Sequence, residues 1–242
     1  MVSYSCLNNI NQPQRRTESI TIGRLAPDFI ALSTFGYIRL SDYKGKWLII
    51  SSSPSAFSNV ATTEVIDASL NYDKILERGA NMIGLTVDSN NANLAWVYDI
   101  YQKTGISVPF PIVSDVDLAI SEMYGMLNPD RMYTETVRST FIIDPSGKIK
   151  AIYILPATSG KSFDELLRMF DSILIKEKYN LDTPAGWKPG DQVLLPNVNS
   201  YQEIIGRVNN QEALGYNCPF WYVCYTNLNT ESTGSNTEIR EP

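Results

Sequence analysis

Histidine is absent from all 242 residues of the chain. Ser-His-Asp and Cys-His catalytic groups and His-ligated zinc sites therefore cannot be built, and acid–base catalysis near neutral pH loses its usual residue. Cysteine is scarce too, because Cys6, Cys218 and Cys224 are too few for a disulfide-rich scaffold or a four-cysteine zinc site. We expect no cofactor, no metal and a reducing, cytoplasmic location.

Basic clusters and long apolar runs are also missing. The formal net charge is -6, and no basic cluster extends beyond Arg15-Arg16, so we expect no nucleic-acid partner. No apolar stretch approaches the roughly 20 residues that cross a bilayer. The first ten residues lack the basic and apolar regions of a secretory signal. We therefore expect no membrane partner.

The folded part shows strands alternating with helices, which is typical of a layered α/β sheet. Period-2 and period-3.6 apolar patterns predict the following elements: a hairpin (29–32 and 37–40), strands (47–51, 82–87, 111–113, 137–143, 148–155) and helices (63–78, 90–104, 117–124 and one starting at 163). Thr62 or Thr63 is the predicted cap of the first helix. The turn at 144–147 joins two late antiparallel strands, so the predicted sheet is mixed.

Composition divides the chain into four segments. Residues 1–18 are polar and aperiodic, and we interpret them as a flexible arm. Residues 19–182 form the predicted α/β domain. The Pro/Gly-rich stretch 183–190 introduces a small C-terminal domain (183–227), and residues 228–242 are a predicted disordered tail.

One stretch carries the most chemical information. Residues 53–64 read Ser-Pro-Ser-Ala-Phe-Ser-Asn-Val-Ala-Thr-Thr-Glu, between the apolar run 47–50 and a helical pattern. Together with four further motifs (22–29, 40–47, 137–147 and 183–191), this stretch resembles the AhpC/TSA peroxiredoxins, in particular their one-cysteine type. The resemblance spans about residues 20 to 226. It implies a thioredoxin-like mixed sheet flanked by helices, with a small C-terminal dimerisation domain.

The resemblance also implies a set of site residues. The family pattern is Pro-x-x-x-Thr/Ser-x-x-Cys, in which the cysteine attacks peroxide. Pro54 and Ser58 match it, whereas Ala61 occupies the position of the nucleophile. By resemblance, Pro54 shields the pocket, Ser58 bonds the peroxide, Glu64 holds an arginine network and Arg138 stabilises developing charge. With alanine at position 61, the peroxidase chemistry of the family is not expected.

Two origins of the alanine are open: an engineered replacement of cysteine, or natural loss of the chemistry. An engineered change would leave the neighbouring residues intact. Ser53, Ala56 and Asn59 also depart from the family pattern, so we favour natural loss.

Plainer interpretations exist for the same residues. Arg138 could be a structural ion-pair partner, and Ser58 an ordinary helix cap. Ser58, Thr62 or Thr63 would need an activating base to replace the thiol, and no histidine is present to serve as one.

Cys218 and Cys224 flank an aromatic run that includes Trp221 and Tyr222. By resemblance, a C-terminal cysteine could resolve an oxidised peroxidatic one. The two cysteines could also form a disulfide with each other or pack as free thiols beside the aromatic side chains, and we favour packing. The aromatic run itself is the predicted dimer interface.

These observations lead to three functional hypotheses. The favoured one is a non-peroxidase homologue with a binding, scaffold or regulatory role. It would assemble as a homodimer or a ring of dimers, with active peroxiredoxin relatives as further candidate partners. The first alternative is a thiol-dependent peroxidase of hydrogen peroxide and organic hydroperoxides, here a Cys-to-Ala variant or one that uses another cysteine. The second is recruitment of the vestigial pocket for a different reaction.

Overall fold

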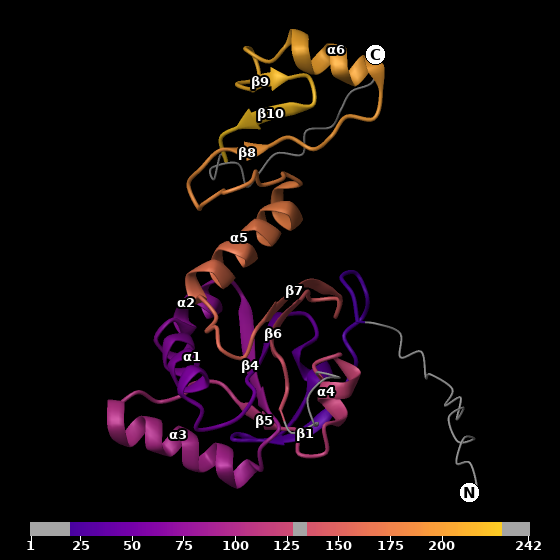
Figure 1. Cartoon of the computed structure of the whole chain (residues 1–242). Helices are drawn as coiled ribbons and strands as arrows, with labels where there is room; N and C mark the ends of the chain where they lie inside the picture. The colour runs from indigo at the N-terminus through magenta and orange to yellow at the C-terminus, as the bar shows by residue number, and fades with distance from the viewer. Residues whose placement is uncertain (1–19, 128–134, 229–242) are drawn as a thin grey trace, which may run out of the picture. The chain divides into compact units, whose positions relative to one another are not determined.

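The computed structural model describes residues 20–127 and 135–228 of the chain. These residues divide into two compact units between Lys161 and Ser162, and Figure 1 shows the elements of both. The sequence-based boundary at 182/183 stays a prediction. The predicted arm (1–18) and the predicted tail (228–242), apart from residue 228, lie outside the described residues.

The first unit is built on a seven-stranded sheet with the order β2-β1-β5-β4-β3-β6-β7. Its strands are β1 (Ile30–Ser33), β2 (Gly36–Arg39), β3 (Trp47–Ser52), β4 (Ala80–Thr86), β5 (Ile112–Ser114), β6 (Arg138–Ile143) and β7 (Ile149–Leu155). β3, β4 and β5 pair in parallel, and every other neighbouring pair is antiparallel. The predicted thioredoxin-like α/β class with a mixed sheet is thereby confirmed.

The turn between β6 and β7 follows from its residues. Asp144 Oδ1 accepts hydrogen bonds from the backbone amides of Ser146 and Lys148, both at 2.9 Å. Gly147 adopts φ 88°, a conformation that favours glycine because a Cβ would be strained there. This closes the antiparallel hairpin that makes the sheet mixed.

The helices of the first unit are η1 (Leu40–Tyr43), α1 (Asn59–Leu70), α2 (Tyr72–Glu77), α3 (Asn90–Thr104) and α4 (Ala119–Met123). The prediction of a single helix over 63–78 was wrong in two ways. The first helix starts earlier, with Ser58 and not Thr62 or Thr63 as its cap. It also ends at Asn71, whose side chain donates to the Asp67 carbonyl and so competes with the helical backbone.

Helices cover both faces of this sheet. Figure 1 shows α1 and α3 on one side and α4 on the other. α3 contacts α1 through Trp96, whose Nε1 donates to Thr62 Oγ1 at 3.0 Å. On the α4 side, alternate strand residues such as Leu48, Ile50 and Phe141 form a buried core with Tyr124. The end of β3 in this sheet therefore determines where α1 begins.

The second unit contains α5 (Phe163–Tyr179), α6 (Tyr201–Asn209) and a three-stranded sheet with the order β8-β10-β9. Its strands are β8 (Val193–Leu194), β9 (Asn217–Phe220) and β10 (Val223–Thr226). A small core of Ile175, Trp187 and Val193 connects α5 with β8. The predicted helix starting at 163 is confirmed by α5.

The two C-terminal cysteines are paired in the structure, contrary to the sequence-based interpretation. Cys218 Sγ and Cys224 Sγ are joined in a disulfide at 2.10 Å, so the preference for free, packed thiols was wrong. The antiparallel pairing of β9 with β10 brings the two side chains together, a contact that six residues of sequence separation do not by themselves require.

Candidate functional site

The candidate site lies where β3 ends and α1 begins. At the end of β3, the Ser52 and Ser139 hydroxyls are 2.8 Å apart and hydrogen bonded, which ties the strand to β6. Pro54 is buried in the loop that follows. The Ala56 amide donates to Asp88 Oδ2 at 2.6 Å, just beyond the end of β4. The loop is therefore anchored on both sides before the helix begins.

Ser58 caps the helix directly before the predicted nucleophile position. Its Oγ accepts a hydrogen bond from the Ala61 amide at 3.3 Å, so a free amide of the first turn is satisfied. Ala61 is fully buried, with 0% of its surface exposed. The Thr62 hydroxyl donates to the Ser58 carbonyl and accepts from Trp96, while that of Thr63 donates to the Val60 carbonyl. These hydroxyls stabilise the helix, and none of their hydrogen bonds within the described part of the chain is to a carboxylate or an amine.

A buried cluster of charges lies beside the first turn of α1. Glu64 follows Ala61 by three residues and so shares its helix face. Glu64 Oε2 pairs with Arg138 Nη1 and lies 3.5 Å from Lys161 Nζ. Glu64 Oε1 accepts from the Lys161 backbone amide at 2.7 Å. One carboxylate therefore holds two cations, one from β6 and one from the segment that precedes α5.

Backbone carbonyls complete the cluster. Lys161 Nζ donates to the Ser52 carbonyl at 2.7 Å, and Arg138 Nη2 donates to the Ala157 carbonyl at 3.0 Å. The Arg138, Glu64 and Lys161 side chains are only 1%, 6% and 9% exposed. Burial lowers the pKa of Lys161 to about 8, although the neighbouring Glu64 carboxylate opposes that shift.

One donor in the cluster has no acceptor. Arg138 Nε is buried and has no hydrogen-bond partner within the described residues. An unsatisfied buried donor beside a helix N-terminus would favour a small anionic or strongly accepting group. The site can therefore stabilise negative charge, but its residues supply no thiol nucleophile.

The structure brings together most of the predicted site residues. Ser58, Ala61 and Glu64 lie on the first turns of α1, Pro54 lies in the preceding loop, and Arg138 joins them through its ion pair with Glu64. Cys218 and Cys224 lie in the second unit. The catalytic roles assigned to these residues by resemblance stay predictions.

Lys161 is a member of the cluster that was not predicted from the sequence. The residue stands between Gly160 and Ser162, where Ser162 caps α5, so its place in the sequence looks like an ordinary polar turn before a helix. The signal available was a lysine in the loop between the predicted strand 148–155 and the helix that starts at 163. Such a signal is too common to single the residue out.

Two other findings bear on what the protein could bind. Within residues 20–127 and 135–228, no three Cys, Asp or Glu side chains gather closely enough to hold a metal ion. Across the same ranges, no helix has both the length and the apolar character needed to cross a membrane.

Comparison with known proteins gives consistent matches across the chain. A model of the AhpC/TSA family matches residues 22–152, and a model of the C-terminal domain of 1-Cys peroxiredoxin matches residues 176–211. Peroxiredoxin 2 of Caldanaerobacter subterraneus subsp. tengcongensis is 44% identical over 204 residues, which cover 84% of this chain and 91% of the relative. A peroxiredoxin of Aquifex aeolicus is 36% identical over 214 residues, covering 84% of this chain and 95% of the relative.

Solved structures agree with these matches. A yeast mitochondrial 1-Cys peroxiredoxin superposes with a TM-score of 0.77 and 31% identity, over 86% of this chain and all of the other. A mutant of peroxiredoxin 6 of Arenicola marina with a cysteine-to-serine change superposes with a TM-score of 0.78 and 29% identity, over 88% of this chain and all of the other.

Proposed function

Because this chain belongs to the AhpC/TSA family of peroxiredoxins, we propose that it is a member without peroxidase activity that acts as a binding, scaffold or regulatory protein. One observation carries this proposal. By its place in the family pattern, Ala61 occupies the predicted nucleophile position, and its methyl group is fully buried and cannot attack an O–O bond. Peroxide reduction by this family needs a thiolate at that point.

Within the part of the chain that the structure describes, no other thiol can take the place of the missing cysteine. Cys218 and Cys224 are joined to each other, which leaves neither as a free thiolate. Cys6 lies outside the described residues. The hydroxyls of Thr62 and Thr63 already donate to backbone carbonyls, and each would need a base to become a nucleophile.

The deciding experiment is a peroxidase assay on three forms of the full chain. Hydrogen peroxide consumption with a dithiol reductant is measured for the unmodified chain, for Ala61→Cys and for Ala61→Ser as a size-matched control without a thiol. We expect the unmodified chain and Ala61→Ser to match the buffer background. Fast turnover by the unmodified chain would contradict the proposal.

The alternative is that the chain represents a thiol-dependent peroxidase of hydrogen peroxide and organic hydroperoxides, in the form of a Cys-to-Ala variant. The observation that favours it is that the Glu64–Arg138–Lys161 cluster is complete and contains a buried donor, Arg138 Nε, that has no acceptor within the described residues. Turnover in Ala61→Cys alone would support this ancestry. An inert Ala61→Cys would instead indicate that the changes at Ser53, Ala56 and Asn59 have dismantled the pocket.

A second alternative is a different reaction in the same pocket. The lowered pKa of Lys161 and the free donor of Arg138 are the features that favour it. The 9% exposure of the Lys161 side chain argues against it, because a substrate would need a path to the amine. Labelling of Lys161 by a small amine-reactive reagent, read by mass spectrometry of the folded chain, tests for that path.

A further inference from the structure

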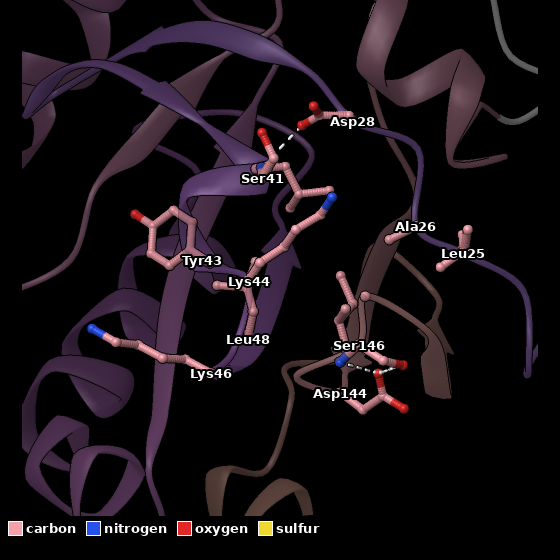
Figure 2. A pocket seen from close by; sticks show the side chains of 13 residues that line it. Leu25, Ala26, Asp28, Ser41, Tyr43, Lys44, Lys46, Leu48, Asp144 and Ser146 are labelled. Carbon is pink, nitrogen blue, oxygen red and sulfur yellow. Dashed lines mark hydrogen bonds between the residues drawn. The ribbon is translucent and has the colours of Figure 1, made fainter.

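A second pocket lies at the opposite end of β3 from the candidate site. Its lining includes Leu48, near the start of the strand, whereas the candidate site follows Ser52. These residues are about 13 Å apart along an extended strand. The pocket has a volume of about 340 Å³, within the range of small-molecule sites. Its walls come from the segment before β1, from η1 and from the β6–β7 turn, all within the first unit (Figure 2).

The inner surface of this pocket is mainly apolar. Leu40, Leu48 and Ile143 are buried members of the core and form its base. Leu25 forms part of the wall, and this large aliphatic side chain is 67% exposed. An apolar ligand would cover Leu25 and exclude water from the base, so the pocket favours a hydrocarbon body.

The pocket is also lined by two carboxylates, which already accept hydrogen bonds from the backbone. Asp28 Oδ1 accepts from the Phe29 and Ser41 amides, each at 3.0 Å. Asp144 Oδ1 accepts from the Ser146 and Lys148 amides. Each carboxylate therefore uses its Oδ1 atom to hold a turn of the backbone, and Asp144 Oδ2 also lies 3.8 Å from Lys150 Nζ.

Unlike these carboxylates, the two lysines of the lining have no bonding partner among the residues that the structure describes. The Lys44 and Lys46 side chains have no hydrogen-bond or ion-pair partner in the described part of the chain. Each ammonium carries three donors and no acceptor. Figure 2 shows the Lys44 amine extending toward the Asp28 and Ala26 side of the pocket, whereas the Lys46 amine extends the opposite way. Lys44 is therefore the donor placed to meet a ligand.

From this arrangement we propose that the pocket binds a small amphipathic carboxylate. The hydrocarbon body packs against Leu40, Leu48 and Ile143, and the carboxylate accepts hydrogen bonds from Lys44 at the mouth. The binding involves no residue of the Ala61 site and does not depend on the presence or absence of peroxidase activity.

Three ten-carbon probes test the proposal on the full chain: decanoate, decanol and decylamine, all below their aggregation concentrations. Amide NMR shifts report where each binds. We expect saturable decanoate shifts confined to residues 25–28, 40–48 and 143–147, weaker binding of decanol, and the weakest binding of decylamine. Equal binding of all three probes, or decanoate shifts that lie elsewhere, would overturn the proposal.

Two matched variants test the role of the ammonium. Lys44→Gln is expected to weaken decanoate binding by up to about fivefold, the upper limit for one exposed ion pair, and to leave decanol binding unchanged. Lys46→Gln removes the same charge two residues away and is expected to change decanoate binding less than twofold. Equal effects of the two variants would show a general charge effect and contradict the assignment of Lys44.

A third variant tests the pocket itself. Ala26→Leu places a larger side chain in the wall and is expected to abolish the binding of both decanoate and decanol while the circular dichroism spectrum stays unchanged. Persistent binding in a folded Ala26→Leu would contradict the location. If Ala26→Leu does not fold, the comparison of Lys44→Gln with Lys46→Gln still decides the question.

Discussion

Glu64 is the residue on which the buried charges of the first unit depend. Its two carboxylate oxygens contact Arg138 and both the amide and the amine of Lys161. Two buried cations without this anion would repel each other in a medium of low polarity. The cluster thus fixes the relation between α1, β6 and the segment before α5.

We predict that Glu64→Ala destabilises the fold by about 3 to 5 kcal/mol, because it leaves two buried cations uncompensated. Urea denaturation followed by circular dichroism measures this loss. The matched control is Glu165→Ala, which breaks the pair with Arg168, where both side chains are about one third exposed. Such a surface pair is worth at most about 1 kcal/mol. Equal losses in the two variants would contradict the structural role of Glu64.

Lys161 makes the free energy of unfolding depend on pH. Its pKa in the folded chain is about 8, below the ordinary lysine value of 10.5, because burial penalises the charged form. Between these two pH values the unfolded chain binds more protons at this residue than the folded chain, so the free energy of unfolding contributed by Lys161 rises with pH. Below pH 8 both states are protonated and the burial penalty is constant.

The corresponding measurement compares the unmodified chain with Lys161→Met, which keeps the aliphatic stem and removes the titrating amine. The free energy of unfolding of the unmodified chain is expected to rise relative to that of Lys161→Met between about pH 8 and 10.5, by up to roughly 3 kcal/mol. Titrating groups that do not interact with Lys161 cancel in this difference. A difference that stays constant over this range, or falls, would show that the pKa of Lys161 is not lowered.

At the scale of elements, the β9–β10 hairpin is held by a covalent link as well as by the hydrogen bonds between its two strands. The disulfide between Cys218 and Cys224 closes a loop with a sequence separation of six residues. Phe220, Trp221 and Tyr222 lie inside that loop, and each is about half exposed. The aromatic side chains are thereby presented on a short constrained turn.

We predict that removing this link loosens the hairpin by about 2 kcal/mol, the value for so small a closed loop. Hydrogen exchange of the β9 and β10 amides, with and without a reductant, measures the change. A variant carrying both Cys218→Ser and Cys224→Ser serves as the control, since a reductant should not alter its exchange. Protection that is the same in all samples would show that the link does not stabilise the hairpin.

At the scale of the whole molecule, we infer that the chain forms a homodimer or a ring of dimers, with active peroxiredoxin relatives as further candidate partners. The exposed aromatic residues of the β9–β10 turn support this inference, because a cluster of aromatic side chains is typical of interfaces. Size-exclusion chromatography with light scattering is expected to give at least twice the chain mass of 27.1 kDa.

A pair of variants locates the contact. Trp221→Ala is expected to shift the assembly toward smaller species, whereas Tyr101→Ala on α3, an equally exposed aromatic residue at 49%, is expected to leave it unchanged. A strictly monomeric unmodified chain would contradict the assembly. The cytoplasmic location stays a sequence-based prediction.

The sequence predicted which elements the fold contains better than it predicted where they begin and end. Strand order along the chain, the turn at 144–147 and helix α3 follow from local apolar periods and turn residues, which need no distant partner. The start and end of α1 were misplaced, because the Ser58 cap and the Asn71 side chain act through hydrogen bonds that the apolar period does not contain. Element boundaries depend on such local competition.

The amino-acid sequence by itself determined the family, the mixed α/β class and the absence of a thiol at position 61, because residue identity and local pattern carry these properties. Only the tertiary structure decided that Lys161 joins Glu64, 97 residues away in the chain, and that Cys218 pairs with Cys224. It also formed the pocket beneath Lys44 from three separate segments. The physical reason is that such contacts arise from strand register and loop closure, which bring distant residues together and are not written in any short stretch of sequence.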